Sequence, residues 1–373
     1  MRIPPFKLER FFALYEFKVE ILLSSSDCES LSMSELIGMA APETRQMWDT
    51  LRLGYTESPG HPGLRAEIAR QYAGIPADNL VVMAPEEAIF IAMHTLLEPG
   101  DAVVAVAPAY QSLQEVARAL GCPVTLWPLT PTASGWQLDL NALERSLSPR
   151  TRLLVLNFPH NPTGFLPTRA EFEAVLALAG RYGITVFCDE MYRLLEHDPA
   201  ARLPAVCEVY EKGVSLAGLS KSFALPGLRI GWLAAQDPAL AQRWLAFKDY
   251  TTICSSAPSE ILAITALQNS GPILSRNRSI VLHNTALAEE FCRAYPQLFE
   301  WIPPQAGSIA FPRWCGAEAV EDFCRTVLED QGVMIVPGSL FDYPGNHFRV
   351  GLGRQNFAEG LARLRQQLTT RPA

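Results

Sequence analysis

The sequence predicts an α/β protein with a seven-stranded, mainly parallel sheet in a large domain and a second, smaller α+β domain. Three observations support this prediction. The chain has 373 residues, more than one hydrophobic core usually supports. From about residue 60 to 250, short apolar runs alternate with helical patterns. After about Pro258 the alternation stops, and longer helical stretches with scattered short strands follow.

The expected strands of the large domain are continuous apolar runs, which is typical of strands that are covered on both faces. They lie at residues 80–83, 102–107, 124–127, 153–157, 185–188, 214–217 and 230–234. Helices are expected at 63–72, 86–97, 112–120, 140–147, 169–181 and 238–250. Asp139 and Thr168 are natural N-caps, and Glu171 completes a capping box with Thr168.

The remaining residues are expected to form the small domain. A helix at 260–268 should be broken by Gly271 and Pro272 before a long helix at 273–294. Strands at 298–302, 308–311, 333–336 and 348–351 and helices at 317–330 and 357–368 follow. The first 45 residues have no sheet of their own and should pack on this unit. The expected domains are therefore 46–272 (large) and 1–45 with 273–373 (small).

Composition argues against several classes of protein. A net charge of −8 and a pI near 5.4 argue against a nucleic-acid partner. No apolar run approaches the length of a membrane span, and residues 1–20 resemble an amphipathic helix more than a signal peptide. The eight cysteines include no C-x-x-C pair, and the six histidines lack metal-ligand spacing. We therefore expect reduced thiols, no metal site and a cytoplasmic location.

Four polar segments stand out in a fixed order along the chain. They are Asn-Phe-Pro-His-Asn-Pro-Thr-Gly at 157–164, Asp-Glu-Met-Tyr at 189–192, the stretch 220–232 that begins Ser-Lys, and His-Phe-Arg-Val-Gly at 347–351. Each alone has an ordinary interpretation as a turn, a cap or a solvated loop. Three of them, however, follow predicted strands of one parallel sheet, and ligands bind such sheets beyond the carboxyl ends of the strands. Together they predict a binding site.

These segments resemble the class I/II aminotransferases of the fold-type-I pyridoxal-phosphate family, over essentially the whole chain. Residues 157–164, 225–232 and 248–251 are more loosely similar to the branch that contains capreomycidine synthase, which cyclises an arginine derivative. The resemblance implies pyridoxal 5'-phosphate as the cofactor. It also implies an enzyme that transfers an amino group from an L-amino acid to a 2-oxo acid.

The resemblance also implies roles for single residues around the cofactor ring. Lys221 would form a Schiff base with the cofactor and later move the substrate α-proton. Asp189 would face the ring nitrogen and keep it protonated. Asn161 and Tyr192 would hydrogen-bond the ring hydroxyl oxygen, and Tyr110 would stack on the ring face.

At the phosphate, the resemblance implies that Arg229 clamps the anion with help from Ser220. Tyr55 would reach the phosphate of a neighbouring subunit, which implies a homodimer with shared active sites. Tyr55 and Tyr110 also have the ordinary interpretation of packed core aromatics. The chain departs from the family pattern at Ala84-Pro85-Glu86, because Pro85 has no N–H and Glu86 adds negative charge. We expect the main-chain amide of Glu86 to contact the phosphate.

For the substrate, the resemblance implies that Arg349 binds the α-carboxylate in a site that also contains Asn161. The loop at 24–30 is unusual for the family. With Glu16 upstream, it offers carboxylates such as Asp27 that could pair with a distal cation, as in arginine. The ordinary interpretation is a solvated loop that caps a helix at 33–39.

Three hypotheses for function remain open from the sequence. The first is an aminotransferase, and the second is an elimination or cyclisation on an arginine-like amino acid by the same fold. The third is a degenerate cofactor-binding module of a transcription regulator. The third is disfavoured because the catalytic residues look intact and no helix-turn-helix domain precedes the fold.

Overall fold

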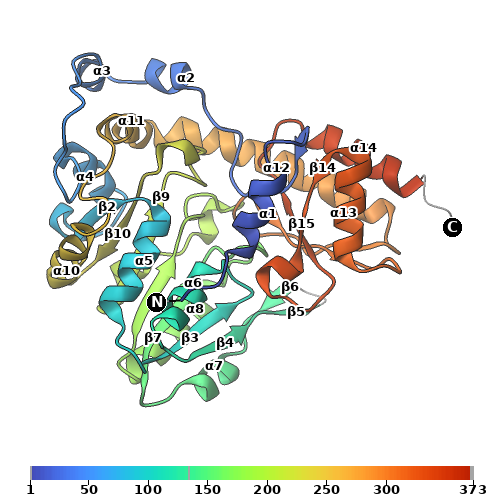
Figure 1. Cartoon of the computed structure of the whole chain (residues 1–373), viewed down its shortest axis with the longest axis horizontal. Helices are drawn as coiled ribbons and strands as arrows, with labels where there is room; N and C mark the ends of the chain where they lie inside the picture. Colours follow the sequence, from blue (N-terminus) through green and yellow to red (C-terminus); the bar gives the residue numbers. More distant parts are fainter. Residues whose placement is uncertain (1, 133–134, 370–373) are drawn as a thin grey trace.

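The computed structural model describes residues 2–132 and 135–369. Its centre is a seven-stranded sheet in the order β2–β10–β9–β8–β7–β3–β4, built from the seven segments that the sequence predicts (Figure 1). The strands are β2 Leu80–Met83, β3 Ala102–Ala107, β4 Val124–Pro128, β7 Thr151–Asn157, β8 Thr185–Asp189, β9 Gly213–Gly218 and β10 Gly231–Ala235. β10 is antiparallel to both of its neighbours, and all the other pairs are parallel.

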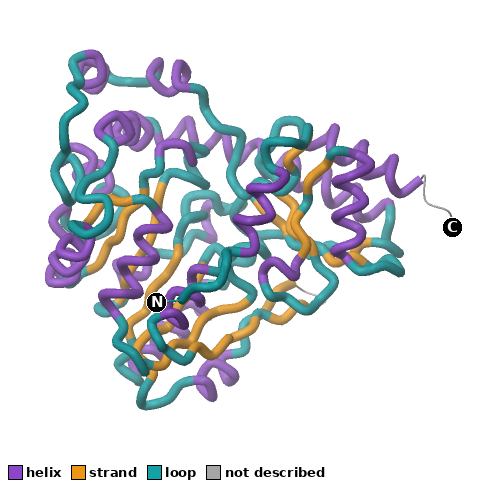
Figure 2. The backbone as a smooth tube through the Cα atoms, viewed as in Figure 1, coloured by secondary structure: helices purple, strands orange, loops and turns teal. Residues whose placement is uncertain are grey.

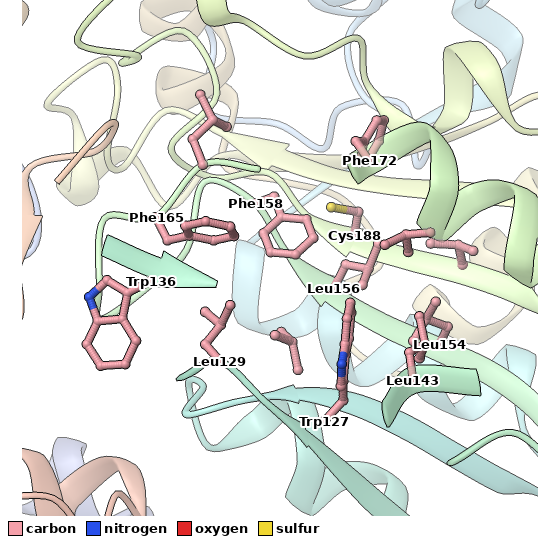
Figure 3. Packing of buried hydrophobic residues seen from close by; sticks show 14 of the residues in the cluster. Trp127, Leu129, Trp136, Leu143, Leu154, Leu156, Phe158, Phe165, Phe172 and Cys188 are labelled. Carbon is pink, nitrogen blue, oxygen red and sulfur yellow. The ribbon is translucent and has the colours of Figure 1, made fainter. Parts of the chain in front are cut away.

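Helices cover both faces of this sheet, which explains why its strands are apolar throughout (Figure 2). In β7, Leu154 and Leu156 face a core that also contains Trp127 and Phe172 (Figure 3). The alternate residues Leu153 and Val155 belong to the core on the opposite face. The helices are α4 Pro62–Ala69, α5 Pro85–Leu96, α6 Ser112–Ala119, α7 Leu140–Ser146, α8 Arg169–Arg181 and α10 Pro238–Lys248.

The predicted caps are confirmed. Asp139 accepts a hydrogen bond from the amide of Ala142 at 2.9 Å, and Thr168 forms a capping box with Glu171. The predicted helix break at Gly271 and Pro272 is wrong, because α11 (Ala257–Gln268) ends and α12 (Ser270–Ala294) begins around Asn269. Pro272 lies in the first turn of α12, where amides lack intrahelical partners, so a proline is tolerated there.

Beyond α12, short strands and two helices pack together. Three strands form the sheet β12–β16–β15, and two further pairs are β1–β14 and β11–β13. The elements are β11 Phe299–Glu300, β12 Ile309–Ala310, β13 Arg313–Trp314, α13 Val320–Gln331, β14 Val333–Met334, β15 Val336–Pro337, β16 Phe348–Gly351 and α14 Phe357–Thr369. β13 was not predicted, and neither was the pair β5 (Thr130–Thr132) and β6 (Gly135–Gln137).

The N-terminal segment divides its contacts between two regions (Figure 1). β1 (Ile21–Leu22) pairs with β14, whereas α2 (Met33–Gly38) and α3 (Pro42–Asp49) pack against α11. The first helix, α1, is shorter than the predicted amphipathic stretch and spans Lys7–Tyr15. It is tied to Gln111 of the large sheet region and to Asp342 near β16. Within the described residues, no helix combines the length and apolar character that a membrane crossing needs.

Candidate active site

A cavity of about 650 Å³ lies at the carboxyl ends of the parallel strands. Four neighbouring strands each supply a predicted residue to it. Asp189 ends β8, and Tyr110, Asn161 and Lys221 follow β3, β7 and β9. The other predicted residues that line it are Glu16, Asp27, Glu86, Tyr192, Ser220, Arg229 and Arg349. Tyr55 does not line it, since its side chain is 92% exposed on the surface.

Asp189 is held by Asn157, the last residue of β7. The side-chain amide of Asn157 donates to the main-chain oxygen of Asp189 at 3.0 Å, and its oxygen accepts from the Asn161 amide at 2.8 Å. The Asp189 carboxylate accepts from the Met191 amide at 3.1 Å. Burial raises the pKa of Asp189 to about 6. A buried carboxylate of this kind is suited to face a cationic partner.

Lys221 is partly buried, and its Nζ donates a hydrogen bond to Ser26 Oγ at 2.8 Å. Burial lowers the pKa of Lys221, and the neighbouring carboxylates Asp27 and Asp189 oppose that effect without reversing it. A lowered pKa leaves more of the amine neutral, which is the form that acts as a nucleophile or a base.

Arg349 is almost completely buried at the edge of the cavity, with 1% exposure. One terminal nitrogen donates to the main-chain oxygen of Ser24 at 2.8 Å, and the other donates to Asn161 Oδ1 at 3.2 Å. Its Nε has no hydrogen-bond partner among the described residues. A buried guanidinium with unused donor capacity indicates a site for an anion.

The two cavity tyrosines bind the N-terminal segment. The Tyr192 hydroxyl donates to the main-chain oxygen of Ser26 at 3.0 Å, and the Tyr110 hydroxyl donates to Glu9 Oε1 at 2.7 Å. Burial raises the pKa of both phenols, so they remain hydrogen-bond donors at neutral pH. The ring of Tyr110 also lies 4.7 Å from that of Phe6, between centroids.

Ser220 and Arg229 give the cavity further donors for an anion. Ser220 Oγ is buried without a hydrogen-bond partner among the described residues. Arg229 has a left-handed backbone, with φ of 55°, and lines the cavity with Pro85 and Glu86 at the start of α5. Glu86 accepts a hydrogen bond from Ser112 Oγ at 3.3 Å, and burial raises its pKa to about 7. Glu86 lines the cavity, whereas Ser112, which its carboxylate contacts, does not.

The cavity also contains residues that were given no role from the sequence, among them Glu9, Ser26 and Arg354. Arg354 donates to both carboxylate oxygens of Asp27, at 3.2 and 3.3 Å. Gly351 and Gly353, next to Arg354 in the sequence, hint at this contact. A Cβ on Gly351 would lie 1.8 Å from the Ser25 main-chain oxygen, so only glycine allows the two segments to approach so closely. The two glycines show that loop 24–30 passes close to this part of the chain.

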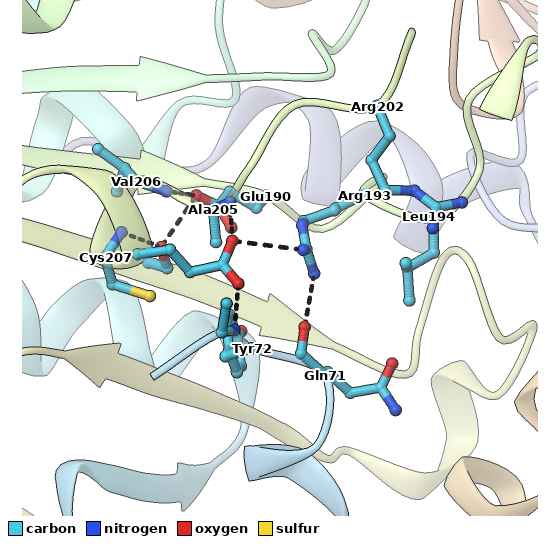
Figure 4. Close-up of polar contacts among 12 residues, drawn as sticks. Gln71, Tyr72, Glu190, Arg193, Leu194, Arg202, Ala205, Val206 and Cys207 are labelled. Carbon is cyan, nitrogen blue, oxygen red and sulfur yellow. Dashed lines mark hydrogen bonds and ion pairs between the residues drawn. The ribbon is translucent and has the colours of Figure 1, made fainter. Parts of the chain in front are cut away.

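Behind Asp189, a buried polar network fixes the end of β8 (Figure 4). Glu190 accepts hydrogen bonds from the Val206 amide at 2.7 Å and from Ser215 Oγ at 2.9 Å. Arg193 lies 3.6 Å from Glu208 and over the ring of Tyr72. Because this network faces away from the cavity, it positions Asp189 without contacting a ligand.

The fold matches enzymes of known structure. A pyridoxal-phosphate-dependent aminotransferase from Streptococcus suis 89-1591 superimposes with a TM-score of 0.93 at 29% identity, over all of both chains. The pyridoxal-phosphate-dependent cyclase OrfR gives a TM-score of 0.91 at 29% identity, over 100% of this chain and 99% of that one. The protein is a pyridoxal-phosphate-dependent enzyme.

Sequence comparisons give the family. The family model for aminotransferase class I and II matches residues 19–364. Capreomycidine synthase from Streptomyces vinaceus is 32% identical over 377 residues, which cover 99% of this chain and 95% of that protein. The chain belongs to the class I and II aminotransferase family.

The residues of the cavity fit pyridoxal phosphate. The partnerless hydroxyl of Ser220 and the guanidinium of Arg229 suit the phosphate, the buried carboxylate of Asp189 suits the ring nitrogen, and the amine of Lys221 suits the aldehyde. The cavity volume of about 650 Å³ is within the range for ligands of this size.

The pKa of Glu86 leads to a prediction for cofactor retention. A nearby phosphate anion favours the neutral acid, so binding of the cofactor takes up a proton, and affinity should fall as the pH rises above about 7. The amine form of the cofactor, which has no covalent link, should dissociate faster at pH 9 than at pH 6. In the Glu86→Gln variant, the dissociation rate should depend less on pH. The Glu87→Gln variant, changed at the neighbouring residue, should keep the wild-type pH dependence. Equal pH dependence in all three proteins, measured by absorbance after dialysis, would contradict the prediction.

Proposed function

We propose that this enzyme transfers the amino group of an L-amino acid to a 2-oxo acid, with the cofactor joined to Lys221. The observation that supports it most is the partly buried amine of Lys221, of lowered pKa, in one cavity with Asp189 and Arg349. When bound, pyridoxal phosphate supplies an electron-accepting ring that stabilises negative charge at the substrate α-carbon.

Five residues would hold the cofactor ring. Lys221 joins the aldehyde, Asp189 keeps the ring nitrogen positively charged, and Tyr110 lies against the ring face. Asn161 would donate to the ring hydroxyl oxygen. Tyr192 would also donate to it once its single hydroxyl proton turns away from the Ser26 main-chain oxygen, which Ser308 would continue to bind. The phosphate would be bound by Ser220, Arg229 and the main-chain amide of Glu86.

Lys221 and Arg349 would act on the substrate. Arg349 binds the α-carboxylate through its paired nitrogens, which fixes the α-carbon relative to the lysine. The neutral amine of Lys221 then takes the proton from the α-carbon and returns it. Burial supports both roles, since it lowers the pKa of Lys221 and strengthens ion pairing at Arg349.

We propose that the amino donor carries a distal cation, as arginine does, and that Glu16 binds it. Glu16 and Asp27 both line the cavity, but Asp27 is already paired with Arg354. Glu16 makes no side-chain hydrogen bond or ion pair within the described residues. Burial raises the pKa of Glu16, and Asp27 and Glu9 raise it further, as expected for clustered carboxylates that a cation would relieve.

Glu16→Gln should therefore lower the ratio of kcat/KM for arginine to kcat/KM for leucine by about 10- to 100-fold. The reason is that a hydrogen bond to a charged group contributes about 1.5–3 kcal/mol. Glu20→Gln is the matched control, since Glu20 pairs with Arg363 outside the cavity. Initial rates with a panel of amino donors give the measurement. A wild-type enzyme that clearly prefers leucine or phenylalanine to arginine and lysine would refute this assignment.

A second candidate reaction is elimination or cyclisation on an arginine-like amino acid. The acidic group of Glu9, Glu16 and Asp27 in the cavity favours it, as does the similarity to capreomycidine synthase and to a cyclase. A single turnover without 2-oxo acid separates the two reactions. Transamination leaves the cofactor in its amine form, whereas cyclisation returns the aldehyde form, and the absorption spectrum distinguishes them. Mass spectrometry of the product then gives either a 2-oxo acid or a ring.

We also propose a homodimer with shared active sites, in which Tyr55 reaches the phosphate of the partner subunit. Tyr55 is 92% exposed, and Tyr250 is similarly exposed at 91%. Their segments are adjacent, because Ser58 Oγ donates to the main-chain oxygen of Ile253 at 2.7 Å. Exposed aromatics grouped in this way are typical of an interface. Sedimentation of the purified protein as a monomer at micromolar concentration would contradict the dimer.

A cytoplasmic location is likewise a proposal. It is supported by the cysteines of the described residues, which are all free and mostly buried. Thiols of this kind are typical of a reducing compartment. Fractionation of the source cells would test it, and recovery of the protein outside the cytoplasm would refute it.

A further inference from the structure

The segment Ser24–Asp27 is bound tightly to the wall of the cavity through its main chain. Arg349 donates to the Ser24 oxygen at 2.8 Å. The Ser26 oxygen accepts two hydrogen bonds, from the Tyr192 hydroxyl at 3.0 Å and from Ser308 Oγ at 2.9 Å. The position of Ser26 is therefore fixed by main-chain contacts, and its side chain is free for another role.

The side chain of Ser26 contacts Lys221. Nζ of Lys221 donates to Ser26 Oγ at 2.8 Å, and this is the sole hydrogen bond that Nζ makes within the described part of the chain. Asp27 and Asp189 affect the lysine only through their charge. A hydroxyl differs from a carboxylate here, because it orients the amine without adding negative charge that would keep it protonated.

We propose that Ser26 is a positioning residue for Lys221, which holds the amine in line with the substrate α-carbon. This inference rests on the proposed function, in which Lys221 moves the α-proton. When the amine takes the proton it becomes an ammonium, and Ser26 Oγ accepts one of its N–H bonds until the proton is returned. The proton stays on Nζ throughout, so Ser26 neither gains nor loses one.

The structure supplies matched variants. Ser26→Ala removes the hydroxyl but keeps the main-chain oxygen that Tyr192 and Ser308 bind. Ser26→Thr keeps a hydroxyl and should restore the function. Ser308→Ala weakens the attachment of the same loop without touching Lys221, so it controls for a purely structural effect.

The experiment follows exchange of the substrate α-proton with solvent deuterium in the holoenzyme, because transamination and cyclisation both need this step. Ser26→Ala should lower the exchange rate by about 10- to 100-fold, the effect of one hydrogen bond to a charged group. KM should change little, and the isotope effect with an α-deuterated donor should rise. Cofactor content after dialysis should equal that of the wild type. Ser26→Thr should approach the wild-type rate, and Ser308→Ala should match it.

The proposal would be overturned if Ser26→Ala exchanged the α-proton at the wild-type rate and showed the wild-type isotope effect. An equal loss in Ser308→Ala, or loss of the cofactor from Ser26→Ala, would also overturn it, because either result shows a structural role. Failure of the proposed function gives a different result, in which the wild-type holoenzyme exchanges the α-proton of no amino acid in the panel.

Discussion

Replacing Lys221 with alanine is expected to abolish the covalent attachment of the cofactor and to lower kcat on the order of 10⁴-fold, the upper range for loss of a general base. The chain should still fold, because the amine makes one hydrogen bond to residues 2–132 and 135–369 and its removal relieves the cost of burying it. Borohydride reduction followed by mass spectrometry gives the direct measurement. The wild-type chain should gain the mass of the cofactor at Lys221, and the variant should not.

Lys212→Ala is the control for this experiment, since Lys212 is exposed and, among the residues that the structure describes, its amine binds only the main-chain oxygen of Gly183. It should be labelled at Lys221 as the wild type is. If purified wild-type protein remained colourless with pyridoxal phosphate, and borohydride fixed nothing to Lys221, the proposed chemistry would be wrong.

Arg349→Lys is expected to have the second largest effect, on substrate binding. The ammonium of lysine cannot form the paired hydrogen bonds of a guanidinium, and the α-carboxylate would then be buried without its partner. Losses at buried charge pairs are about 2–5 kcal/mol, which corresponds to roughly 30- to 4000-fold in kcat/KM. The main-chain oxygen of Ser24 would also lose its donor, so loop 24–30 should become more mobile.

A substrate analogue separates these two effects of Arg349→Lys. The wild-type enzyme should discriminate strongly between an amino acid and its α-carboxamide, whereas the variant should discriminate weakly. If the variant kept the full preference for the carboxylate, Arg349 would not be the residue that binds it. Comparing the thermal unfolding of the wild type and of Arg349→Lys shows how much the hydrogen bond to the Ser24 main-chain oxygen contributes to stability.

Much of the cavity was predictable because its residues follow apolar strands. The strand pattern predicts that Tyr110, Asn161, Asp189 and Lys221 reach the same edge of the sheet, since parallel strands end there. Local signals also predicted the caps at Asp139 and Thr168, which depend on residues three positions away.

The contacts of the N-terminal segment were not predictable in the same way. Ser26 and Lys221 are 195 residues apart, and no local pattern encodes their meeting. Asp27 pairs with Arg354, which is 327 residues away. Because the sequence does not reveal this pairing, Asp27 and Glu16 were equally good candidates for binding a substrate cation. The break between α11 and α12 was misplaced because Gly and Pro are also compatible with a first helical turn, where tertiary packing decides the boundary.

The strand pair β1–β14 has a consequence for biosynthesis. The segment that holds Ser26 over Lys221 is synthesised first, but its partners around residues 333–354 are synthesised last. At about 5–20 residues per second, these N-terminal residues wait roughly 15–60 s for the strand that fixes them. All seven strands of the large sheet, which end at Ala235, are therefore synthesised before the residues that fix Ser26 beside Lys221.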